Sequence, residues 1–175
     1  MKPERKLGRF TRLSRPLALL ASLVVAAPLN AEESDHAYTM TVIVDAAHGS
    51  KVAAGKYTRA IEKITASKRS GDAYSKQTNL CVAYTKTGAL DKATTACEAA
   101  LAIMLDGGKS RSTYFAPATA NKLDRVYLAL ALSNMGVLQA AKGSTDMARE
   151  TFLEAVGLDT GLSAPKINLA RLAKG

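Results

Sequence analysis

The apolar positions of the chain follow two kinds of pattern. From about residue 57 to the end, apolar residues recur at intervals of three and four, whereas residues 38–44 form one short run rich in β-branched side chains. The first pattern is typical of amphipathic helices, and the second of an extended segment. The pattern therefore predicts an all-α domain with a short extended N-terminal segment.

The helical region contains an internal repeat. Four residues recur unchanged 55 positions further along the chain: Asn79, Gly88, Ala93 and Ala100 correspond to Asn134, Gly143, Ala148 and Ala155. Each glycine lies between two apolar periodic runs, where a helix end needs a residue that tolerates the left-handed conformation. Each copy is thus predicted to form two antiparallel helices joined at the glycine, and such a hairpin buries its faces only by stacking on neighbours.

The small and large positions of both copies resemble the tetratricopeptide repeat, a helix-turn-helix unit of about 34 residues. The spacing of 34 between Asn134 and Asn168 makes residues 164–173 similar to the first helix of a third unit, and Gly55 with Ala60 lies 33 residues before Gly88 with Ala93. The resemblance covers residues 55–175 and implies stacked helix hairpins, an α-solenoid. The matching residues are Leu80, Cys81, Tyr84, Gly88, Leu90, Ala93, Cys97, Ala100, Met135, Gly136, Gly143, Ala148, Phe152 and Ala155.

The same comparison predicts the domain boundaries. Residues 32–54 form an N-terminal extended or linker segment, which holds the run 38–44 and at most one helical turn. Because 55 exceeds the repeat length, an insertion must separate the two central units, and residues 106–120 have the composition of a loop. Helices are expected at residues 57–67, 73–87, 89–103, 121–142, 145–156 and 164–173.

Residues 1–31 have the pattern of an export signal. Six basic residues precede a short apolar run that ends in small residues, and this run is too short for a membrane-spanning helix of about 20 residues. The formal charge of the chain is +9, but the leader carries six of its 24 basic and one of its 15 acidic residues, which leaves +4. We therefore expect a periplasmic or secreted protein without a membrane anchor, and the modest remaining charge argues against nucleic acid as a partner.

The two cysteines, Cys81 and Cys97, lie at similar distances before and after the turn at Gly88. In an antiparallel hairpin they should face each other, and an exported protein would allow them to form a disulfide. The alternative is two small apolar side chains that fill core positions.

No constellation of catalytic or metal-binding residues is apparent. His36 and His48 have no ligand-type spacing to the cysteines, and Lys109 with Ser110 lacks the first glycine of a phosphate-binding loop, since position 103 is Ile. We expect a non-catalytic protein with no metal and no cofactor.

The repeated asparagine suggests a binding surface. The resemblance implies that Asn79, Asn134 and Asn168 line a concave groove, where a carboxamide can both donate to and accept from the backbone of an extended peptide. The alternative is that each asparagine ties neighbouring helices together. The other residues expected in this groove are Val82, Thr85, Lys86, Val137, Ala141 and Arg171.

The resemblance thus implies a periplasmic module that binds a protein or peptide through its concave face. The competing hypothesis is a structural subunit of an envelope assembly that self-associates through residues 38–44. For that segment we expect a covering role over the open end of the helix array or pairing with another chain, and a third possibility is that it fills the groove itself.

Overall fold

The computed structural model describes residues 38–67, 72–106 and 117–174, so the predicted leader at 1–31 and most of the predicted insertion lie outside the described residues. The described residues are all-α, as the sequence predicts, and contain no β-strand. None of their helices is long and apolar enough to cross a membrane. The helices are α1 (Gly49–Ala53), α2 (Tyr57–Ala66), α3 (Ala73–Lys86), α4 (Leu90–Leu105), α5 (Pro117–Ala141), α6 (Thr145–Leu158) and α7 (Ser163–Leu172).

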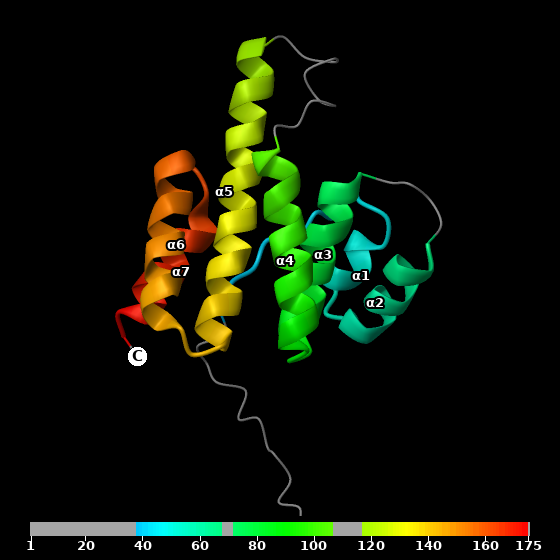
Figure 1. Ribbon diagram of the computed structural model, residues 1–175. Helices are drawn as coiled ribbons and strands as arrows, with labels where there is room; N and C mark the ends of the chain where they lie inside the picture. Colours follow the sequence, from blue (N-terminus) through cyan, green and yellow to red (C-terminus); the bar gives the residue numbers. More distant parts are fainter. Residues whose placement is uncertain (1–37, 68–71, 107–116, 175) are drawn as a thin grey trace, which may run out of the picture. The chain divides into compact units, whose positions relative to one another are not determined.

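The predicted hairpins are formed by α3 with α4 and by α5 with α6, which pack closely against each other (Figure 1). They turn at Gly88 and Gly143, whose φ angles of 72° and 81° are the left-handed values that glycine adopts without strain. Gly55, between α1 and α2, has a φ of 71°. The turns at Gly88 and Gly143 therefore lie where the sequence predicts them.

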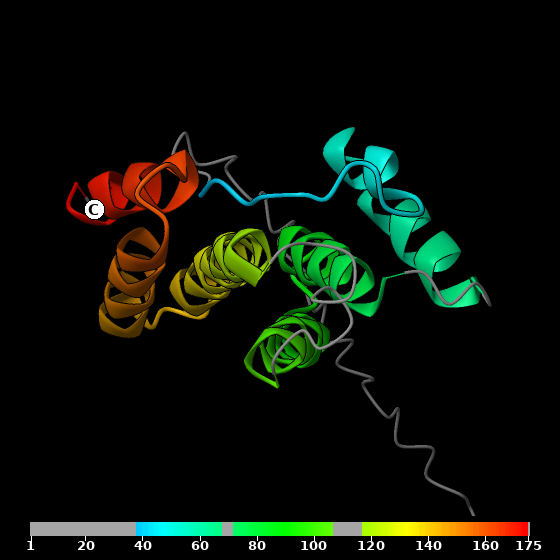
Figure 2. The same cartoon turned by 90° about the horizontal axis from the view of Figure 1, so that it is seen from above.

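Each helix contacts the next one along the chain, so the helices form one continuous series from α1 to α7. Seen from above, α4 lies on the opposite side of α3 and α5 from residues 38–44, which run from α7 toward α1 (Figure 2). We call residues 38–44 the strap. This position corrects the expectation that the segment covers an open end of the array: it crosses the face formed by α3, α5 and α7 instead.

Small residues let the paired helices approach closely. Gly136 on α5 faces Phe152 on α6, and a Cβ atom on this glycine would lie 2.6 Å from the aromatic ring. On the other hairpin, Cys81 and Cys97 are each 1% exposed, their Cα atoms are 4.8 Å apart and their sulfur atoms are at bonding distance. The predicted disulfide between α3 and α4 is thereby confirmed.

The main boundary error concerns the start of α5. The loop predicted at residues 106–120 extends too far, because α5 begins at Pro117 and not at Asn121. Proline is favoured in the first turn of a helix, where its missing N–H costs no hydrogen bond, so it can mark a helix start as well as a loop. The other expected helices agree to within about two residues at each end.

Candidate peptide-binding groove

Three buried asparagines stand at equivalent positions on three helices. Asn79 on α3, Asn134 on α5 and Asn168 on α7 are each at most 1% exposed. A buried carboxamide is costly unless its hydrogen-bonding groups find partners. Here the partner of all three is the backbone of the strap.

Each asparagine binds one strap residue by two hydrogen bonds. The amide of Thr39 donates to Oδ1 of Asn168, and Nδ2 of Asn168 donates to the carbonyl of Thr39, both at 2.8 Å. Asn134 forms the same pair of bonds with Thr41, again at 2.8 Å. Asn79 does so with Ile43 at 2.9 Å.

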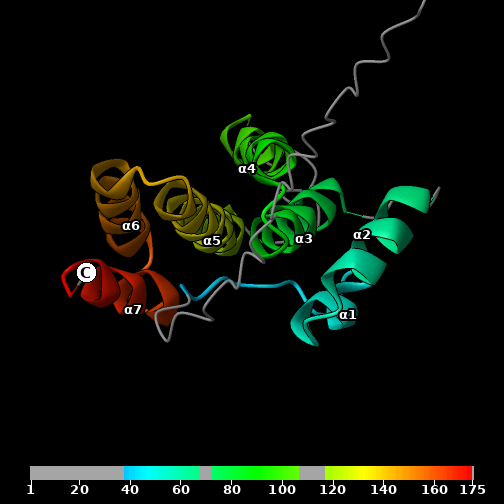
Figure 3. The same ribbon diagram turned by 90° about the horizontal axis from the view of Figure 1, so that it is seen from below.

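The asparagines therefore bind every second residue of the strap, which runs from α7 past α5 to α3 (Figure 3). An extended chain advances about 3.3 Å per residue, so two residues span about 6.6 Å. Packed helix axes lie about 8–10 Å apart, and their side chains can converge to the shorter spacing only on an inwardly curved face. The two-residue period thus indicates that the face of α3, α5 and α7 that holds the strap curves around it, and we call this face the groove.

The strap residues between these bonds pack into the groove wall. Met40 contacts both the core cluster around Val82 and the cluster around Val137. Val42 packs against the first of these clusters, and Tyr38 against the second, where its ring centroid lies 6.5 Å from that of Phe152. Backbone recognition by the asparagines is consequently combined with apolar contacts at alternate side chains.

Two cationic side chains meet the N-terminal end of the strap. Lys86 Nζ donates to the carbonyl of Tyr38 at 2.9 Å, and the guanidinium of Arg171 donates to the hydroxyl of Thr39, also at 2.9 Å. Partial burial lowers the pKa of the Lys86 ammonium group, and the positive charge of Arg171 lowers it further. Within the described ranges, the two charged side chains that bind this end of the strap are therefore both cationic.

Seven of the nine predicted groove residues lie around the strap, whereas the hydroxyl of Thr85 donates to the carbonyl of Cys81 at 2.8 Å within α3. Asn79, Asn134, Asn168, Lys86 and Arg171 bind it directly, whereas Val82 and Val137 are only 2% and 3% exposed and belong to the core against which it packs. The hydrogen bonds of the carboxamides go to the strap, which differs from the alternative in which each asparagine ties two helices together. Their role toward a separate ligand remains a prediction.

Sequence analysis did not identify Gly49 as part of this arrangement. A Cβ atom at this position would clash with the carbonyl oxygens of Ile43 and Val44. Only glycine lets the start of α1 approach the end of the strap this closely. In the sequence, Gly49 is only a glycine in the short segment after the β-branched run, and this does not predict the contact.

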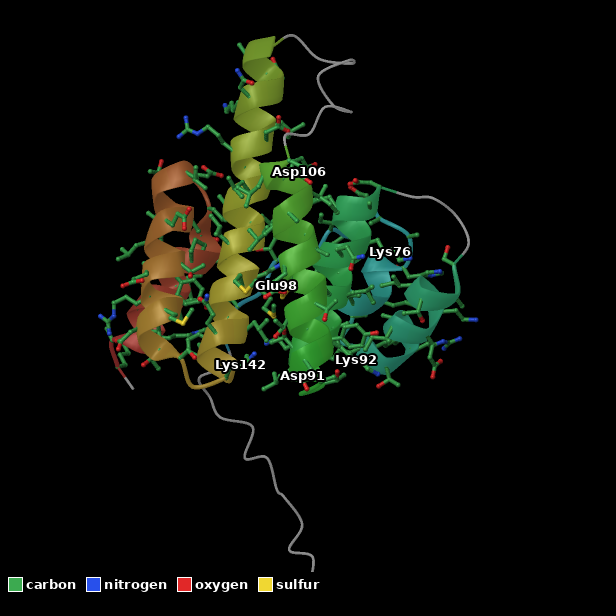
Figure 4. The ribbon with its side chains drawn as sticks, viewed as in Figure 1. Lys76, Asp91, Lys92, Glu98, Asp106 and Lys142 are labelled. Carbon is green, nitrogen blue, oxygen red and sulfur yellow. A yellow bond between two sulfur atoms is a disulfide. The ribbon has the colours of Figure 1, made fainter. Side chains whose placement is uncertain are left out.

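The opposite surface has a different character. Asp91, Lys92 and Glu98 on α4 are exposed and project from the side that faces the viewer in Figure 4, whereas the strap passes behind α5. Within the described ranges, no group of three or more His, Cys, Asp or Glu side chains is placed to hold a metal ion. The strap, in contrast, is bound by side chains from three helices that are distant from it in sequence.

Comparisons with known proteins found no match among family models, curated proteins or solved structures.

Proposed function

We propose that this protein is a non-catalytic, exported interaction module of tetratricopeptide type, which binds extended peptide segments through the groove on its inner face. The observation that carries the proposal is the set of six hydrogen bonds from Asn79, Asn134 and Asn168 to alternate backbone units of the strap. On the strap, these bonds use only main-chain groups, which any extended peptide presents. The strap is then the resident occupant of a peptide site.

The proposed ligand is an extended segment of a protein in the same compartment. Its alternate side chains should be apolar, because Tyr38, Met40 and Val42 fill the corresponding places in the strap. It must also displace the strap. A tethered segment acts at an effective concentration of the order of millimolar, so a free peptide of equal intrinsic affinity binds the intact protein only weakly.

The test is to weaken the strap without altering the groove. Thr41→Pro removes the N–H group that donates to Asn134 at 2.8 Å and leaves every groove residue unchanged. Thr41→Ala is the matched control, since it shortens the side chain at the same position but keeps the donor. The probe is a fluorescent peptide with the sequence of residues 36–46, and the readout is fluorescence anisotropy.

We expect the Thr41→Pro protein to bind the peptide in trans at least tenfold more tightly than the wild type or the Thr41→Ala protein. Adding Asn134→Ala to Thr41→Pro should abolish this gain. If the Thr41→Pro protein is unfolded by circular dichroism, the peptide should raise its melting temperature, because a ligand that binds only the folded state stabilises it. If the peptide neither binds the Thr41→Pro protein nor raises its melting temperature, the proposal is overturned.

Self-association is the second candidate function, and the strap itself favours it, since a second copy carries the same segment. Exchange of straps between two copies would preserve all six hydrogen bonds. Sedimentation velocity at increasing protein concentration tests this. A dimer that is lost in a Thr39→Pro/Thr41→Pro variant would support exchange, whereas a concentration-independent monomer would rule it out.

A further inference from the structure

The N-terminal end of the strap is held differently from the rest. At Thr41 and Ile43, the side chain that binds the strap backbone is an asparagine. At Tyr38 and Thr39, two cationic side chains are added: Lys86 binds the carbonyl of the first residue and Arg171 the hydroxyl of the second. The part of the groove that holds residues 38 and 39 therefore differs from the rest by its two cationic side chains.

The two cations come from opposite sides of the array. Lys86 is in the last turn of α3 and Arg171 in the last turn of α7, which are far apart in sequence but both reach residues 38–39. Their charges are close enough that Arg171 contributes to the lowered pKa of Lys86, after the larger effect of burial. The strap offers them a carbonyl oxygen and a hydroxyl oxygen, which are both neutral acceptors.

A carboxylate at this place would be a stronger acceptor. The present bonds already have ionised donors, and an ionised acceptor would add direct Coulombic attraction to both cations. The ends of α3 and α7 each carry a partial negative charge of about half a unit, which is less than the full positive charge that each cation brings. Taken together, the two cations and the two helix ends therefore favour a negative side chain at the position of Thr39.

We propose that Lys86 and Arg171 form a subsite that selects extended peptides with an acidic side chain at the position that Thr39 occupies in the strap. This inference rests on the proposed function of the groove, because it names the class of peptide that the groove prefers. The preferred segment has apolar residues at the places of Tyr38, Met40 and Val42, and Asp or Glu after the first of them. The strap, with threonine there, then has a lower intrinsic affinity for the groove than such a ligand, while its tether still favours it in the intact protein.

The subsite can be tested first within the intact protein, independently of any added ligand. Thr39→Asp and Thr39→Asn have nearly the same shape and differ in charge, so their comparison isolates the carboxylate. The readout is hydrogen exchange of the strap amides at residues 39, 41 and 43, which reports how often the strap opens. We expect these amides to exchange about 1.5- to 5-fold more slowly in the Asp variant, the range typical of exposed ion pairs.

Two backgrounds and one control make the assignment specific. The difference between Asp and Asn should shrink with Lys86→Gln, vanish with Lys86→Gln/Arg171→Gln, and weaken in 1 M salt. The matched control is Thr41→Asp against Thr41→Asn, which should show no advantage for Asp. An equal Asp advantage in all backgrounds, or faster exchange in Thr39→Asp than in Thr39→Asn, would overturn the subsite.

The second arm uses peptides of residues 36–46 with Asp or Asn at position 39, titrated into the Thr41→Pro protein. The Asp peptide should bind more tightly by the same factor of about 1.5 to 5. Equal binding of both peptides, with no charge effect within the intact protein, would overturn the subsite and leave the proposed function intact. Failure of both peptides to bind, with a positive result within the intact protein, would overturn the proposed function and retain the charge preference of the groove.

Discussion

Replacing Asn134 by alanine is the most informative single perturbation of the groove. The side chain is 1% exposed and forms two hydrogen bonds of 2.8 Å with the middle of the strap. A typical hydrogen bond contributes about 0.5–1.5 kcal/mol to stability, so the loss of both should cost about 1–3 kcal/mol. The strap amide and carbonyl at Thr41 are only partly buried, so water can replace part of what is lost and the cost should not exceed this range.

The assay is urea denaturation followed by circular dichroism, with Ser133→Ala as the control. Ser133 is the preceding residue on α5 and is fully buried, but its hydroxyl has no hydrogen-bond partner in the described part of the chain. Its replacement should change the free energy of unfolding by no more than about 0.5 kcal/mol, with some gain from the higher helix propensity of alanine. A cost for Asn134→Ala as small as that for Ser133→Ala would refute the claim that the carboxamide holds the strap.

Two further predictions concern the packing of the hairpins. Reduction of the Cys81–Cys97 disulfide, which closes a loop of 16 residues, should lower the free energy of unfolding by about 3 kcal/mol on the chain-entropy account; denaturation with and without dithiothreitol measures this, and identical curves would contradict it. Gly136→Ala should cost about 1–3 kcal/mol, because the added Cβ would lie 2.6 Å from the ring of Phe152. Gly157→Ala, where an added Cβ meets no other atom within 4 Å, is its control and should be neutral or slightly stabilising in thermal melts.

The features that repeat along the chain could be predicted from the sequence. The turns at Gly88 and Gly143 could be predicted because the two glycines occupy the same position of the repeat, and each hairpin needs the same backbone conformation there. The disulfide follows from the distances of its two cysteines from the turn. The convergence of the three asparagines was also expected, since equivalent positions on stacked helices share one face.

The sequence suggested three possible locations for the strap but could not distinguish between them. A β-branched run predicts an extended conformation, but its polar partners are side chains on α3, α5 and α7, up to 132 residues away. Nothing local distinguishes a segment that lies in its own groove from one that covers an end or pairs with another chain. The contact of Gly49 with the strap was missed for the same reason, because it depends on tertiary packing.

We propose that the three asparagines bind the backbone of an extended peptide, whether it is the tethered strap or a free ligand. The most direct measurement is the ¹H–¹⁵N NMR spectrum of the carboxamide groups of Asn79, Asn134 and Asn168. In the Thr41→Pro protein these signals should move away from their wild-type positions, and addition of the peptide of residues 36–46 should return them. Carboxamide signals that remain unchanged by the peptide, in a protein that is still folded, would contradict the account.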